Sequence, residues 1–128
     1  TANLLRIKEA LGERVGRDVF FYALTLDPVI DTPEVLAGYA ASVGAGHGFT
    51  FLTGAEADIH LVRRRLGLYD PDPAVDADRS RHGAVAVCGN DRLGRWCHVP
   101  ALLRPERIMR TLRFIVPPET PGDAPRRA

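Results

Sequence analysis

The chain has 128 residues, which is enough for one domain with a hydrophobic core and too few for two. Hydrophobic residues make up 45% and charged residues 26%, as in an ordinary soluble globular protein, and the net charge of +1 gives no indication of binding to nucleic acid or to a membrane surface. No apolar run approaches the ~18 residues of a membrane-spanning helix, and no signal-peptide pattern is present.

The first residues predict an amphipathic helix. Apolar side chains recur at helical spacing with charged residues between them, at Leu4, Ile7, Leu11 and Val15. This helix begins at the first residue, with no earlier element on which to pack. We therefore expect the sequence to be a fragment of a longer chain.

A buried strand and a capped helix are predicted next. The run 18–26 is almost continuously apolar, which is typical of a strand buried on both faces of a sheet. Thr32 can cap a helix, Pro33 suits its first position, and Gly44 can end it. The residues predicted to face inward from this helix are Leu36, Tyr39, Ala40 and Val43.

The middle of the chain predicts a short strand at 48–54 and a helix from about Ala55 to Leu66, which Gly67 ends. Ile59, Val62 and Leu66 are expected to face inward, and the arginines at 63–65 to form a solvated face. The segment 67–81 has the composition of a loop. Its aspartates alternate suggestively but lack the register of a calcium loop, so a solvated loop is the favoured interpretation of Asp70, Asp72, Asp76 and Asp78.

A β-hairpin and a final helix are predicted to close the domain. The strands are 83–90 and 94–100, with a turn at 91–94 that places Cys88 opposite Cys97. The last helix starts near Pro105, and its inward side chains are expected to be Ile108, Leu112, Ile115 and Val116. Residues 117–128 are predicted to be a disordered tail.

The order of these elements predicts an α/β fold. Strands that alternate with helices imply right-handed crossovers and a parallel core. The closing hairpin and helix resemble the second half of a thioredoxin-like fold, with a mixed sheet and flanking helices. We expect one such domain at 1–116, incomplete at the N-terminus because the fold needs a strand before the first helix.

The two cysteines and the histidines allow several interpretations. Cys88 and Cys97 could be core residues, a disulfide pair or metal ligands; core packing is favoured, a disulfide is second and ligation is third. A structural zinc site needs four ligands, and Cys88, Cys97 and His98 supply three at most. Zinc is further disfavoured because Cys97 and His98 are adjacent in a strand and point to opposite faces. His47 and His60 are predicted to be surface residues, as is His82 when judged alone. No motif for a nucleophile or for phosphate binding occurs.

Three segments together resemble the Sco/SenC family of thioredoxin-like copper chaperones. The stretch "LTLDPVIDTPEVLAGYA" is similar to the family's strand-turn-helix segment with Asp-Pro-x-x-Asp-Thr-Pro. The opening "TANL" resembles the residues that closely follow a Cys-x-x-x-Cys-Pro motif. The stretch "HGAVAVCGNDRLGRWCHVPAL" resembles one branch's His-(Ser/Thr)-Gly segment, which runs into Gly-Asn-Asp, Arg-Trp and Pro-Ala-Leu. The similarity covers residue 1 to about residue 116.

The resemblance implies a metallochaperone rather than a catalyst. The two cysteines of Cys-x-x-x-Cys and one distant histidine bind copper in this family, and thiolates with an imidazole suit Cu(I) and Cu(II). By position, His82 is the implied copper ligand, and the implied partner is the copper-centre subunit of cytochrome c oxidase, whose binuclear centre receives the metal. The implied location is the periplasmic side of a bacterial inner membrane, with a membrane anchor upstream.

The sequence departs from the family pattern at two places. It begins just beyond the expected Cys-x-x-x-Cys motif, and Gly83 and Ala84 follow His82 where relatives have Ser or Thr and then Gly. We expect this fragment to bind copper weakly, and its two cysteines to pack in the core. The alternative function is a thiol-disulfide oxidoreductase or peroxidase of the same fold. A third is an interaction module that never had the motif.

Overall fold

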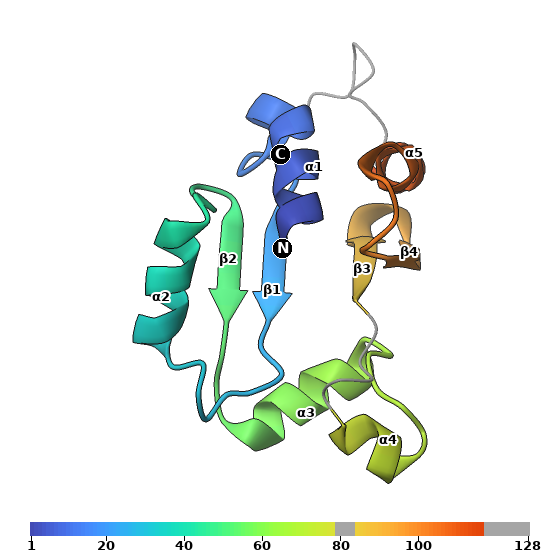
Figure 1. The fold of residues 1–128 in the computed structure, drawn as a ribbon. Coiled ribbons are helices and arrows are strands. Elements are labelled where there is room, and N and C mark those ends of the chain that lie inside the picture. Colours follow the sequence, from blue (N-terminus) through green and yellow to red (C-terminus); the bar gives the residue numbers. More distant parts are fainter. Residues whose placement is uncertain (79–83, 117–128) are drawn as a thin grey trace, which may run out of the picture.

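The computed structural model describes residues 1–78 and 84–116. Its helices and strands alternate through the first half of the chain and end in a hairpin and a helix (Figure 1). In chain order these are α1 (Ala2–Leu11), the 3₁₀ turn η1 (Gly12–Arg14), β1 (Phe21–Leu24), α2 (Pro33–Ser42), β2 (Phe49–Leu52), α3 (Glu56–Arg65), α4 (Pro73–Ala77), β3 (Val85–Asn90), the 3₁₀ turn η3 (Asp91–Leu93), β4 (Arg95–Pro100) and α5 (Pro105–Ile115).

The core joins the two ends of the chain. Ile7 of α1, Val99 of β4 and Ile108 of α5 form one buried cluster, and Leu4 and Leu11 pack against it. The inward stripe predicted for the first helix is therefore confirmed. Its predicted extent to Val15 is wrong, because the helix ends at Leu11, and Gly12 at φ 55° turns the chain out of the helical path.

β1 and β2 form a parallel pair joined by α2. Phe21 lies opposite Phe49 in the register, and their rings stack 5.4 Å apart. The strand at β1 is confirmed, but its expected burial on both faces is wrong, since Tyr22 is 64% exposed. Phe21 packs against the core cluster on one face of β1, whereas Tyr22 points to the other face and stays exposed.

The helix α2 begins and ends where the sequence predicts. Thr32 accepts a hydrogen bond from the Val35 amide at 3.4 Å, Pro33 is the first helical residue, and Gly44 follows at φ 64°. Before it, Thr25 donates to the Asp31 carboxylate and accepts from the Asp27 amide at 2.8 Å. The Asp-Pro-x-x-Asp-Thr-Pro segment thus ties the end of β1 to the start of α2.

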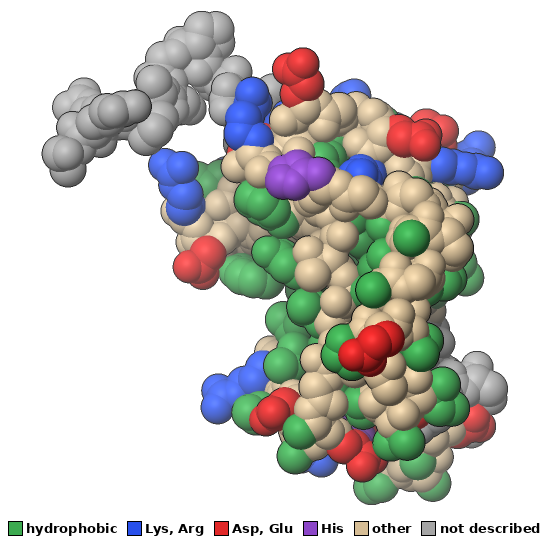
Figure 2. Space-filling view, turned by 90° about the vertical axis from the view of Figure 1, so that its left-hand side faces the viewer, with side chains coloured by type: hydrophobic (Ala, Val, Ile, Leu, Met, Phe, Trp, Pro, Cys, Tyr) green, Lys and Arg blue, Asp and Glu red, His purple; other side chains and the backbone are tan. Residues whose placement is uncertain are grey.

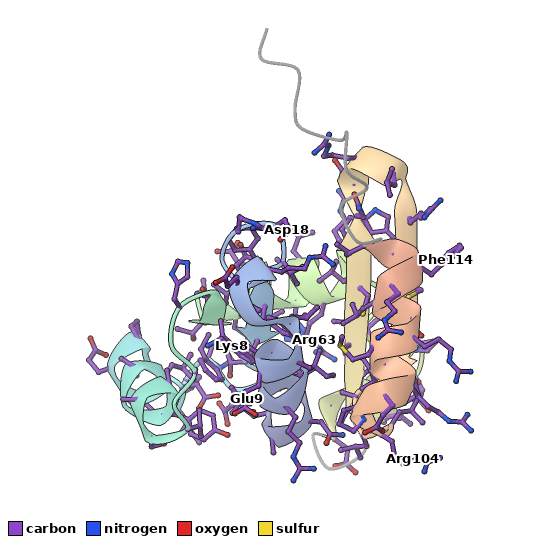
Figure 3. All side chains as sticks on the ribbon, turned by 90° about the horizontal axis from the view of Figure 1, so that it is seen from above. Lys8, Glu9, Asp18, Arg63, Arg104 and Phe114 are labelled. Atoms are coloured by element: carbon purple, nitrogen blue, oxygen red, sulfur yellow. The ribbon has the colours of Figure 1, made fainter. Side chains whose placement is uncertain are left out.

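The region around α3 corrects two expectations. Ile59 is buried as predicted, but Val62 is 41% exposed and Arg63 is buried in its place. The predicted solvated loop after α3 contains the short helix α4, which Asp72 caps by accepting from the Ala74 amide at 2.9 Å. Seen from above, Arg63 lies within the body of the molecule, whereas Arg104 and Phe114 lie on its outer rim (Figure 3).

The hairpin and the last helix follow the prediction closely. β3 and β4 pair antiparallel with Cys88 opposite Cys97, and Gly94 completes the turn in the left-handed conformation. α5 begins at Pro105 and buries Ile108 and Ile115. The predicted tail at 117–128 lies outside the described residues.

The strands form two separate two-stranded sheets, β1–β2 and β3–β4, where one mixed sheet was expected. Sheet neighbours must lie about 4.8 Å apart to exchange hydrogen bonds. In the described ranges no strand stands between β1 and β3, and α1 lies in front of that interval (Figure 1). The two halves of the expected sheet are therefore present, but they are not joined.

Candidate metal centre

The start of α1 is fixed to the end of the hairpin. The Asn3 side-chain amide donates to the Ala101 carbonyl at 3.1 Å and to the Leu103 carbonyl at 2.9 Å. The Ala101 amide in turn donates to the Ala84 carbonyl at 2.6 Å. This Asn3 bridge, defined by Asn3, Ala101 and Ala84, brings the first turn of α1 next to the residue that precedes β3.

The inner face of the hairpin carries both thiols. Cys88 and Cys97 are free and half-buried, and they pack against the core cluster. Burial first, and then the adjacent Cys97 thiol, raise the pKa of the Cys88 thiol from its ordinary value of 9.0 to about 11. The favoured interpretation of the pair as core residues agrees with this packing.

The described histidines do not join the thiols. The exposed His98, on the face opposite Cys97, places Nε2 2.7 Å from the Leu66 carbonyl oxygen at the end of α3. His60 is 52% exposed on α3, and His47 is exposed in the turn before β2, as the sequence predicts for both. His82 lies outside the described residues.

The aspartates of the segment after α3 have a structural role, because they accept local hydrogen bonds. Asp76 accepts from the Arg63 guanidinium at 2.6 Å and from the Asp70 amide at 2.9 Å. Asp70 accepts from the Asp72 amide, and Asp72 caps α4. These carboxylates are occupied by local hydrogen bonds, which corrects the expectation of a merely solvated loop. Within residues 1–78 and 84–116, no three His, Cys, Asp or Glu side chains lie close enough to hold a metal ion.

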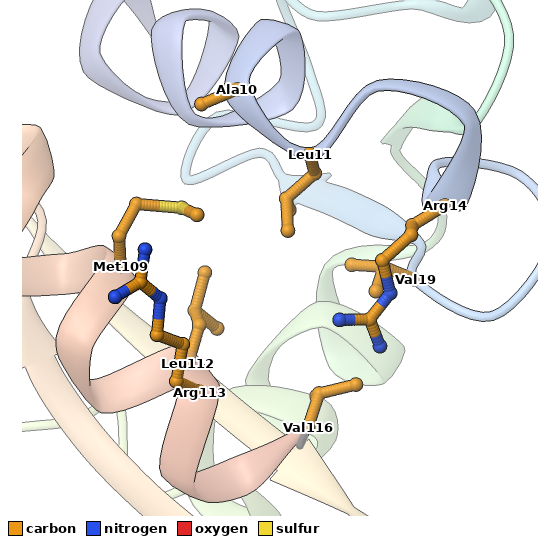
Figure 4. A pocket seen from close by; sticks show the side chains of 8 residues that line it. All are labelled: Ala10, Leu11, Arg14, Val19, Met109, Leu112, Arg113 and Val116. Carbon is orange, nitrogen blue, oxygen red and sulfur yellow. The ribbon is translucent and has the colours of Figure 1, made fainter. Parts of the chain in front are cut away.

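A cavity of about 210 Å³ lies between the C-terminal end of α1 and α5 (Figure 4). Leu11, Met109 and Leu112 make its lining mainly apolar, and Arg14 and Arg113 stand among them. Arg14 is paired with Asp18 at 2.6 Å. Among the described residues that line it, none is a nucleophile or a general base.

A model of the family described as SCO1/SenC matches residues 1–111 of the chain. The chain belongs to the SCO1/SenC family. Its fold is therefore the thioredoxin-like fold, present here in incomplete form, as predicted. Neither the search among curated proteins nor that among solved structures gives a significant match.

Membership of the SCO1/SenC family draws attention to the region that the Asn3 bridge holds together, at the start of α1 and the residue before β3. Family members are generally copper-binding chaperones associated with assembly of the copper centre of cytochrome c oxidase. The structural role of Asn3 could not be predicted from the sequence, because its hydrogen-bond partners lie about 100 positions away and no local pattern indicates them. Among the described helices, none is long and apolar enough to cross a membrane.

Proposed function

We propose that this SCO1/SenC protein is a copper chaperone that delivers copper to the binuclear copper centre of cytochrome c oxidase, with His82 as a copper ligand. The family match over residues 1–111 supports the general role. The proposed partner is the subunit that carries this centre. The proposed location is the periplasmic side of a bacterial inner membrane, where a segment upstream of Thr1 would anchor the protein.

The Asn3 bridge is the observation that favours His82 in particular. His82 precedes Ala84 by two positions in the sequence. Ala84 is held through Ala101 to Asn3, at the first turn of α1. In relatives the Cys-x-x-x-Cys motif closely precedes this turn. The bridge therefore supports a proposed site built from the residues before α1 and the residues before β3.

The chemistry of such a ligand set suits transfer of copper as cargo. Soft thiolates favour Cu(I), and an imidazole nitrogen extends the range to Cu(II). A site of two thiolates and one imidazole at the edge of a domain can pass the ion on by exchange, one ligand at a time. Cys88 and Cys97 do not enter this set, because they face the core on the inner side of the hairpin.

The test uses the protein with its upstream segment included, because the expected cysteines precede Thr1. Replacing His82 by Ala should weaken Cu(II) binding by at least tenfold and leave the free energy of unfolding nearly unchanged. Metal affinity is measured by competition with a chelator, and folding by urea denaturation. His60→Ala removes a histidine that is 52% exposed on α3 and should leave affinity unchanged.

Unaltered Cu(II) affinity in His82→Ala would remove His82 from the site. Reduction of insulin or turnover of peroxide by the extended protein, with no copper retained, would instead identify a thiol-disulfide oxidoreductase or peroxidase. The absence of Cys-x-x-x-Cys upstream would contradict the copper site altogether.

A further inference from the structure

The hydrogen-bonding pattern of the hairpin determines how close its two thiols can come. The Ala101 amide donates to Ala84, and these residues continue the register that pairs Cys88 with Cys97. In an antiparallel ladder, hydrogen-bonded and non-hydrogen-bonded pairs alternate. Ala84 with Ala101 is a hydrogen-bonded pair, and Cys88 with Cys97 lies four positions along each strand. The two cysteines therefore form a hydrogen-bonded pair as well.

This kind of pair fits a disulfide at the backbone but not at the side chains. Cα atoms in a hydrogen-bonded pair are about 5.5 Å apart, close to the ~5.5–6 Å most common for disulfides. Cβ atoms in such a pair lie toward the upper end of ~4.5–5.5 Å, whereas a disulfide needs ~3.5–4.5 Å. The two Cβ atoms would have to approach each other by about 1 Å. A bond formed under such strain is more easily reduced than a relaxed one.

We propose that Cys88 and Cys97 are a redox-sensitive pair that forms a reversible cross-strand disulfide by exchange with small disulfides such as glutathione disulfide. Both thiols are half-buried, so a small disulfide can reach them. They also pack against the core formed by Ile7, Val99 and Ile108, so the bond would draw together the strands on which α5 rests. This pair is separate from the proposed copper ligands.

The reaction proceeds in two exchange steps. The thiolate of one cysteine attacks the glutathione disulfide, forms a mixed disulfide and releases one glutathione thiolate. The second cysteine loses its proton to solvent and attacks the protein sulfur of the mixed disulfide, which releases the second glutathione. Two protein thiols are oxidised to one disulfide, and one glutathione disulfide is reduced to two thiols.

The experiment equilibrates the full chain in buffers with different ratios of reduced to oxidised glutathione. After acid quenching, free thiols are alkylated and counted by mass. The wild type should pass from two free thiols to an internal disulfide without retaining glutathione, and excess reduced glutathione should restore both thiols. Burial is the largest cause of the raised pKa of the Cys88 thiol and does not depend on Cys97. In the variant Cys97→Ser the Cys88 thiolate is therefore still scarce at neutral pH, and the glutathione adduct should form about tenfold faster for each unit by which the pH is raised.

A matched control keeps two cysteines in the hairpin but changes the face of one. In the double variant Cys97→Ser, Trp96→Cys, the new thiol is adjacent in sequence to the old position and points to the opposite face. We expect glutathione adducts rather than an internal disulfide. In an unfolded chain the two cysteines of this variant would form a disulfide as readily as Cys88 and Cys97. The variant therefore also tests whether disulfide formation depends on the strand register of the folded hairpin.

Three results would overturn the proposal. The wild type could keep two free thiols, or carry glutathione adducts, across the whole series. It could remain oxidised in excess reduced glutathione, which would make the bond a structural disulfide rather than a reversible one. Finally, the double variant could form its internal disulfide as readily as the wild type.

Discussion

Arg63 lies where α3, the turn after it and α4 meet. Its side chain is 6% exposed, its guanidinium contacts Asp76 at 2.6 Å, and its Nε donates to the Leu68 carbonyl at 3.2 Å. A buried cation is tolerated when it is paired and hydrogen-bonded, and here a carboxylate and a carbonyl accept hydrogen bonds from the Arg63 guanidinium. Arg63 therefore holds α4 against the end of α3.

Replacing Arg63 by Ala should lower the free energy of unfolding by about 3 kcal/mol, because it removes the guanidinium that pairs with the mostly buried Asp76 carboxylate. Urea denaturation followed by circular dichroism measures the change. Arg65→Ala is the control, since this neighbouring arginine is exposed, and its effect should stay below about 0.5 kcal/mol. Equal losses in the two variants would show that Arg63 is not a structural anchor.

At the scale of elements, the loop before β1 crosses directly over the start of β2. Gly48 adopts φ 78°, and its carbonyl is tied to β1 because it accepts a hydrogen bond from the Phe21 amide at 2.8 Å. A Cβ atom on Gly48 would lie 2.4 Å from Val15 Cγ1 and 2.7 Å from the Gly16 nitrogen. The crossing leaves room for glycine alone.

Gly48→Ala should therefore destabilise the fold by about 2 kcal/mol more than Gly44→Ala does. Both glycines have positive φ, so both variants place alanine in a backbone conformation that favours glycine, but a Cβ on Gly44 meets no atom within 4 Å. The difference isolates the steric collision at the crossing. It is measured as the difference in urea midpoint between the two variants, and no difference would mean that the loops can separate freely.

For the whole molecule, the division into two sheets leaves apolar surface uncovered. Phe20, just before β1, is 52% exposed, and Tyr22, within it, is 64% exposed, while Val29 and Ile30 are exposed after the strand. On the side of the molecule that α2 and β2 form, hydrophobic side chains reach the surface at many points (Figure 2). A strand edge with exposed aromatic residues is a template for pairing with another chain.

We expect the chain to self-associate through β1, and a charge on this strand should oppose it. Tyr22→Lys should reduce light scattering at raised concentration, because a lysine at a sheet edge disfavours pairing with a second strand. Tyr69→Lys makes the same change at a residue that is 47% exposed outside both sheets. If both variants reduce scattering equally, net charge rather than the β1 edge controls association.

Local signals allowed much of this structure to be predicted. Thr32 and Pro33 mark the start of a helix through their own chemistry, and the turn at 91–94 sets the register of the hairpin by counting alone. Val62 and Arg63 were misplaced because helical periodicity ranks residues by hydrophobicity, whereas the position of Asp76, thirteen residues away, decides which side chain is buried. The Asn3 bridge depends on contacts across almost the whole chain, which no local pattern contains.

Because the core joins Ile7 to Val99 and Ile108, it can form only after most of the chain has been synthesised. A ribosome adds about 5–20 residues per second, so roughly 5–20 seconds separate the appearance of Ile7 from that of Ile108. Throughout that time the apolar face of α1 has no final partner. A newly made chain is thus at greatest risk of capture by other nascent chains before its last helix has emerged, and rapid completion of α5 protects it.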